Sequence, residues 1–137
     1  MKNKPRFVTK LQMEHVCGTE SYKLLSPLIC FDEEGERWEL KIGMVSDGHS
    51  IPKLLRSFAG SPFATKFPRP AWFHDFWCRT GIIPRSVADR KYRGLLRLAN
   101  ASKYIQYRNY IGVRVGAGLK WISKRLPWNK RAKQLKK

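Results

Sequence analysis

The chain has 137 residues, of which 42% are hydrophobic and 12% aromatic, so its composition indicates one folded domain and excludes a disordered chain. Its formal net charge of +18 is unevenly distributed: residues 1–47 hold seven Lys/Arg and eight Asp/Glu, whereas residues 90–137 hold fifteen Lys/Arg and no acid. The acid-free third predicts a polyanionic partner, either nucleic acid or an anionic membrane surface. A solvated, solubilising surface is the alternative explanation.

The three cysteines, Cys17, Cys30 and Cys78, lie in unrelated contexts without a CxxC spacing, which favours a reducing compartment over a disulfide framework. No apolar run follows the lysines at the N-terminus, and no stretch approaches the ~20 apolar residues of a membrane span. We therefore expect no signal peptide, no transmembrane segment and a cytoplasmic location.

Three segments near the N-terminus predict an antiparallel sheet of three strands. Residues 6–16 and 22–31 are rich in β-branched and aromatic side chains, and residues 37–45 alternate apolar with polar positions. The polar turn DEEG at 32–35 is the expected hairpin connection.

Helices follow the segment SDGHSIP at 46–52, beginning with a short helix within 54–58. The next is expected to start near Pro70 and run to Arg79, since proline favours the first helical position, and Gly81 ends it. Another opens at Ser86 and forms a hairpin with it. The sequence therefore predicts an α+β fold.

A long basic helix is predicted over 103–125, with Pro127 as its stop. It carries apolar residues at helical spacing, namely Tyr104, Tyr107, Ile111, Val115, Leu119 and Ile122. We expect a single domain at 1–126 and a basic tail at 127–137.

A histidine and two aspartates are the main candidates for chemistry. His74 and Asp75 lie in the aromatic stretch AWFHDFWCR, and on a helix adjacent residues point about 100° apart, so Asp75 does not face His74. A histidine that acts as a base needs its other nitrogen held by a carboxylate. Asp89 on the next helix is the predicted partner, although Ser86 and Asp89 also fit a capping box.

Two residues of the segment SDGHS extend this set. Asp47 could point at the helices, although an Asp-Gly turn in which the carboxylate binds its own backbone is the favoured explanation. Ser50 is a formal nucleophile beside His74 and Asp89, without the surroundings of a nucleophile elbow. The candidate catalytic residues are therefore His74, Asp89, Asp47 and Ser50. No spacing typical of a zinc site or of a phosphate-binding loop is present.

Four motifs, SDGHSIP, AWFHDFWCR, PRSVADRKYRGLL and YIGVRVGAG, occur in this order over roughly residues 37–118. Together they resemble a small domain family of unknown function from tailed bacteriophages, prophages and bacteria. That family has Asp-x-Ala-Ser-x-Pro, Ala-x-x-His-Asp-x-x-Tyr, Ser-Arg-x-x-Ala-Asp and Val-Arg. The matching residues are Asp47, Ser50, Pro52, Ala71, His74, Asp75, Ala88, Asp89, Val113 and Arg114. The resemblance implies a phage-type protein in the infected host cell or in the virion.

The chain departs from this pattern at three places. His49 stands where the family has alanine, Cys78 replaces the tyrosine, and the Ser-Arg pair is inverted as Arg85-Ser86. A thiol supports a histidine through a hydrogen bond less well than a phenol does.

The His-Asp helix followed by a second helix with Asp is also similar to the secreted and viral phospholipases A-two. That likeness implies His74 as general base, Asp89 as its orienting group and Asp75, with Asp47, as ligands of calcium, the candidate metal. No glycine-rich calcium loop of that family is present, and only SDGHS could contribute to one.

Two functions are therefore open. The first is a hydrolase for an ester or phosphoester substrate, which requires Asp89 at His74 and a solvent-reachable pocket on the other side of the ring. The second is a non-enzymatic phage accessory protein that binds nucleic acid through its C-terminal third. The candidate anion-binding residues are Arg114, Lys120, Lys124, Arg125, Lys130 and Arg131.

Overall fold

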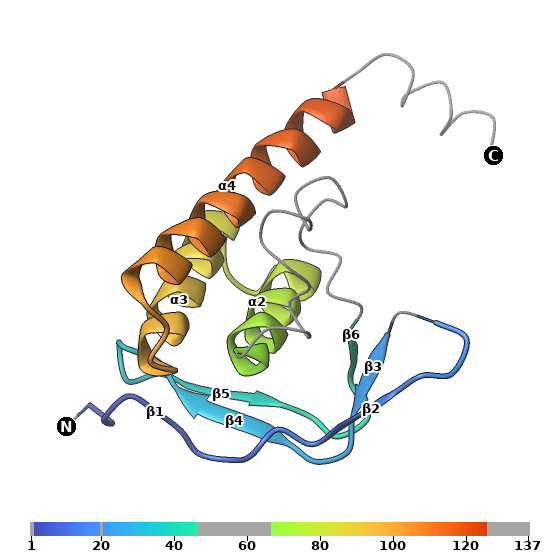
Figure 1. Ribbon diagram of the computed structural model, residues 1–137, viewed down its shortest axis with the longest axis vertical. Coiled ribbons are helices and arrows are strands. Elements are labelled where there is room, and N and C mark those ends of the chain that lie inside the picture. Colours follow the sequence, from blue (N-terminus) through green and yellow to red (C-terminus); the bar gives the residue numbers. More distant parts are fainter. Residues whose placement is uncertain (1, 20, 47–66, 126–137) are drawn as a thin grey trace.

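The computed structural model describes residues 2–19, 21–46 and 67–125 (Figure 1). In these described residues, six short strands precede three helices, which confirms the predicted α+β class. The elements are β1 (Arg6–Phe7), β2 (Met13–His15), β3 (Tyr22–Leu24), β4 (Leu28–Phe31), β5 (Arg37–Leu40), β6 (Val45–Ser46), α2 (Pro68–Thr80), α3 (Arg85–Leu98) and α4 (Lys103–Arg125). The expected short helix at 54–58 and the tail at 127–137 lie outside the described residues.

The strands form two three-stranded antiparallel sheets, with orders β1-β4-β5 and β2-β3-β6, where the sequence predicted one sheet. Each of the three predicted segments is divided between the two sheets. Pro27, which has no N–H for a strand ladder, separates β3 from β4. Gly43, with φ of 86°, separates β5 from β6, because a positive φ interrupts extended backbone.

The helix boundaries follow local signals with one exception. α2 has proline in its first turn and ends at Gly81, whose φ is 63° and whose N–H donates to the carbonyl of Trp77 at 3.0 Å. α3 begins at Arg85 after an N-cap at Pro84, without a side-chain cap. The predicted capping box of Ser86 and Asp89 is therefore wrong.

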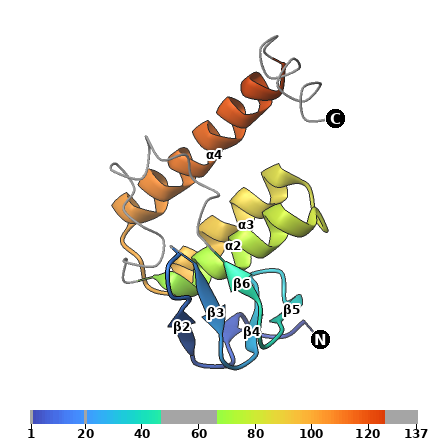
Figure 2. The ribbon, with the colours of Figure 1, turned by 90° about the vertical axis from the view of Figure 1, so that its right-hand side faces the viewer.

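The helices α2 and α3 form the expected hairpin, and α3 also packs against α4. Both views place the two sheets on one side of this hairpin and the C-terminal half of α4 on the other (Figures 1 and 2). One core joins sheets and hairpin and consists of Leu24, Leu28, Cys30, Leu40, Trp72, Phe73, Trp77, Ala88 and Leu95. A second cluster, between α3 and α4, consists of Tyr92, Leu96, Ala101 and Val113. None of the described helices is long and apolar enough to span a membrane.

Candidate functional site

The helical hairpin brings His74 of α2 against Asp89 of α3. The Nε2 of His74 lies 2.6 Å from the Oδ1 of Asp89, and both side chains are buried. The aromatic ring of Tyr92, one turn further along α3, lies 4.8 Å from the imidazole between ring centroids. The predicted contact between His74 and Asp89 is therefore present in the structure.

Two arginines share the carboxylate of Asp89. Arg85, one turn earlier on α3, donates its Nε to Oδ1 at 3.0 Å, and Arg114 of α4 donates an Nη1 to Oδ2 at 2.9 Å. Arg85 also donates to the carbonyl of Val113 at 3.3 Å. Asp89 thus joins all three helices, because each of them contributes a donor to one buried carboxylate.

The protonation states of the pair follow from these contacts. Burial lowers the pKa of His74 below its usual value, and this outweighs the opposing effect of the hydrogen bond to Asp89. Burial by itself would raise the pKa of Asp89, but the hydrogen bond to His74 and the charge of Arg85 hold it below the usual range. We conclude that an ionised Asp89 accepts from the Nε2–H of a neutral imidazole, whose lone pair then lies on Nδ1.

The enzymatic hypothesis also requires a solvent-reachable pocket on the other side of the imidazole. The ring is too deeply buried to meet this requirement. His74 is 1% exposed. Its Nδ1 lies 3.9 Å from the Sγ of Cys78, which is only partly buried. The same sulfur lies 3.6 Å from Nε2, so this thiol packs against the buried ring.

His74, Cys78 and Asp89 place three donor atoms within 4.8 Å of one another, so their geometry alone could hold a metal ion. Their surroundings argue against this, because Arg85 and Arg114 already neutralise the carboxylate and would repel a cation. We assign no metal to this group.

Asp75 points away from His74, as predicted for its neighbour on a helix. Its Oδ2 accepts the hydroxyl of Ser46, at the end of β6, at 2.6 Å, and the guanidinium of Arg79 lies 3.7 Å from the same oxygen. Calcium requires six to eight oxygen ligands. Here a cationic side chain stands beside the carboxylate, and Asp75 is not part of any metal-binding group of three among the described residues. Asp47, the other expected ligand, lies outside the described residues, so the calcium site stays a prediction.

The remaining candidates differ in how far the structure describes them. Asp47 and Ser50 lie outside the described residues, as do Lys130 and Arg131. The backbone of α4 extends through Lys120, Lys124 and Arg125, but their side chains are not described. Arg114, predicted to face an anionic surface, is instead paired with Asp89. The Val-Arg motif was the only sequence signal for this role.

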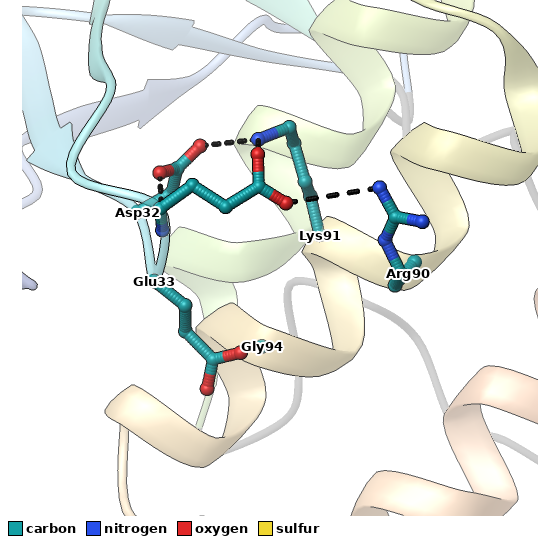
Figure 3. Close-up of a pocket in the computed structure, with 6 residues that line it drawn as sticks. Asp32, Glu33, Arg90, Lys91 and Gly94 are labelled. Atoms are coloured by element: carbon teal, nitrogen blue, oxygen red, sulfur yellow. Dashed lines mark hydrogen bonds and ion pairs between the residues drawn. The ribbon is translucent and has the colours of Figure 1, made fainter.

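The sequence analysis missed a second charged cluster, at the β4–β5 turn (Figure 3). The ammonium of Lys91 in α3 lies 2.6 Å from Asp32, 3.0 Å from Glu34 and 3.2 Å from Glu36. A shallow pocket of about 120 Å³ adjoins it. Its lining residues are Asp32, Glu33, Glu34, Arg90, Lys91 and Gly94. Because the ammonium of Lys91 occupies the point where the three carboxylates converge, and Glu34 and Glu36 are half exposed to water, we interpret this cluster as a structural clamp.

These features define an α+β domain in which a buried His–Asp pair on a helical hairpin is fixed by two arginines. The chain belongs to the family described as "Protein of unknown function (DUF1353)", whose model matches residues 22–113. This range includes His74, Asp75 and Asp89.

Two relatives come from Sinorhizobium fredii (strain NBRC 101917 / NGR234). The chain is 33% identical to "Uncharacterized protein y4iH" over 78 residues, which are 56% of this chain and 33% of that protein. It is 32% identical to "Uncharacterized protein y4jT" over 59 residues, or 43% of this chain and 18% of that protein. The chain thus spans a third or less of these relatives. No solved structure matches it.

Proposed function

We propose that this domain is a hydrolase that acts on an ester or phosphoester, with His74 as the general base. The observation that supports this most directly is the 2.6 Å contact between His74 Nε2 and Asp89. It fixes the ring and its tautomer, so that Nδ1 is the atom that would accept a proton from water. Because His74 is 1% exposed, the proposal requires the side chains around the ring to move aside during turnover. The lowered pKa of His74 keeps the ring unprotonated near neutral pH, as a base requires.

Asp89 is a positioning residue in this proposal, because it acts through His74. Arg85 and Arg114 hold its carboxylate in place, and both guanidiniums are partly exposed. An anionic substrate group next to the pair would interact favourably with them, which favours phosphoesters and phospholipid esters over neutral esters. The phage or prophage origin expected from the motifs stays a prediction.

The test is turnover of a panel of nitrophenyl esters, nitrophenyl phosphoesters and phospholipid vesicles. The variant His74→Ala should abolish turnover while the circular dichroism spectrum stays that of the wild type. His15→Ala is the matched control, since His15 lies exposed on β2, away from the hairpin. Absence of turnover by the wild-type protein on every substrate would contradict the proposal.

A second candidate function is favoured by the burial of the His74 ring. A sealed imidazole and a carboxylate neutralised by two arginines also describe a purely structural network. The protein would then be a non-enzymatic accessory protein that binds nucleic acid through its acid-free C-terminal third. This function predicts affinity for labelled DNA that falls steeply with salt and is unchanged in His74→Ala. Salt-insensitive binding, or none, would count against it.

A further inference from the structure

The face of α4 that packs against α3 is more polar than the periodicity of its hydrophobic residues predicts. The side that faces α3 carries Gln106, Asn109 and Val113, all buried. The two amides are satisfied there, since Gln106 donates to the carbonyl of Ala101 at 2.9 Å and Asn109 donates to the hydroxyl of Tyr92 at 3.3 Å. Polar side chains therefore occupy much of the inner face of this helix.

The outer face carries four large hydrophobic side chains, which we call the α4 stripe: Tyr104, Tyr107, Ile111 and Val115. Tyr104 is 73% exposed and Ile111 57% exposed. With 100° per residue, the four positions fall within an arc of about 80° on the helix surface. Single exposed hydrophobic residues are common, but a continuous row of them on one helix face marks an interaction surface.

Cationic side chains border the stripe on both sides. Lys103 lies along one edge of the arc and Arg108 along the other, given the same helical period, whereas Arg114, next to Lys103 on the helix surface, is paired with Asp89. The guanidinium of Arg108 lies 5.9 Å from the ring centroid of Tyr104, and that of Arg93 lies 4.3 Å from the centroid of Tyr107. The surface thus combines an apolar centre with positive flanks.

Three kinds of partner could bind the stripe, and they differ in how well they match its apolar centre and positive flanks. A second copy of the chain would bring equal positive flanks together, since residues 90–137 contain no acid in either copy. Nucleic acid would satisfy the arginines and could stack on tyrosine, but Ile111 and Val115 have no counterpart on a phosphate backbone. A membrane surface with anionic headgroups matches both parts, because aliphatic and tyrosine side chains enter the interface while the cations contact the headgroups.

We propose that the α4 stripe is a docking surface for an anionic lipid membrane. The stripe lies on the N-terminal half of α4, on the side opposite the buried Gln106, Asn109 and Val113, so it faces away from α3. The proposal goes beyond both functions above, since it requires neither turnover by His74 nor a nucleic acid. Under the hydrolase proposal it would also bring the domain to a phospholipid substrate.

The test is co-sedimentation of the full chain with vesicles of phosphatidylcholine alone and of phosphatidylcholine with an equal amount of phosphatidylglycerol. The wild type should bind the anionic vesicles and bind the neutral ones weakly. The double variant Ile111→Ser/Val115→Ser should weaken binding to anionic vesicles by at least about tenfold. Both residues are exposed, so the fold should be retained, which circular dichroism verifies.

The matched control is Ile42→Ser/Ile82→Ser, which removes two exposed isoleucines that lie off the stripe, 64% and 61% exposed. This variant should bind anionic vesicles as the wild type does.

Equal binding by the stripe variant and the wild type would overturn the proposal, as would a stripe variant that loses affinity for DNA while its vesicle binding is unchanged. A wild-type dimer that the stripe variant converts to monomer, without vesicle binding, would assign the stripe to a second copy instead. Loss of turnover in His74→Ala with vesicle binding intact separates this proposal from the hydrolase.

Discussion

Lys91 of α3 donates to Asp32 at the β4–β5 turn across a sequence separation of 59 residues, and both side chains are buried. Asp32 also accepts the indole N–H of Trp38 at 2.8 Å and the backbone N–H groups of Glu34 and Glu36. One ion pair thus orders the hairpin turn and attaches one of the sheets to the helical hairpin.

We predict that Lys91→Met destabilises the domain by about 3–5 kcal/mol near neutral pH, because it leaves the buried carboxylate of Asp32 without its counter-charge. Urea unfolding followed by tryptophan fluorescence measures the change. Arg97→Ala is the control, since its pair with Glu33 is exposed at 53% and 44% and should contribute less than about 1 kcal/mol. Equal effects of the two variants would contradict the clamp.

We predict that Asp89→Asn destabilises the domain by a similar amount, about 3–5 kcal/mol, because Arg85 and Arg114 then face a neutral amide. Glu39→Gln, which removes an exposed partner of Arg37, should change the free energy of unfolding by less than about 1 kcal/mol. A melting temperature of Asp89→Asn equal to that of the wild type would show that the charge of this carboxylate does not stabilise the domain through Arg85 and Arg114.

The lowered pKa of His74 makes stability depend on pH. Its unfolded pKa is about 6.5, so below that value the unfolded chain binds a proton that the folded chain does not. Stability should be fully present above about pH 6.5 and should fall below it by up to about 1.4 kcal/mol per pH unit.

The free energy of unfolding, measured from about pH 7 to about pH 5, tests this dependence. The variant His74→Gln should lose most of the slope, because its side chain does not titrate. A slope that is the same in wild type and variant would mean that other groups cause it.

Burial raises the pKa of Cys30 to about 12, whereas Cys17 is exposed. We therefore predict that iodoacetamide at about pH 8 modifies Cys17 in the folded protein and leaves Cys30 unmodified until urea is added. Peptide mass spectrometry reports each site separately. Modification of Cys30 at the rate of Cys17 would place it at the surface rather than under the helices.

Local signals in the sequence were sufficient for the helices. Proline in the first turn and Gly81 at the end located α2 within a few residues, and the period of the hydrophobic residues located α3 and α4. The extended segments were also predicted, but their division into two sheets was not. A break at Pro27 or Gly43 limits the length of a strand, but it does not decide which other strand the residues on each side of the break pair with.

The contact between His74 and Asp89 was predictable, since a histidine beside hydrophobic residues and an aspartate on the next helix meet in a helical hairpin. The roles of Arg85 and Arg114 were not, because they depend on how α4 crosses α3. Even the face that α4 buries was decided only by the fold. Its apolar stripe suggests a buried side by periodicity, yet hydrogen bonds to Tyr92 and Ala101 make its amide side the one that fits against α3.

Local propensity, periodicity and residue type were thus enough to predict the class of fold, the described helices and the His74–Asp89 pair. Tertiary structure alone decided which charges meet, how far His74 is buried and which surface of α4 remains exposed, because these depend on packing between segments that are distant in the chain.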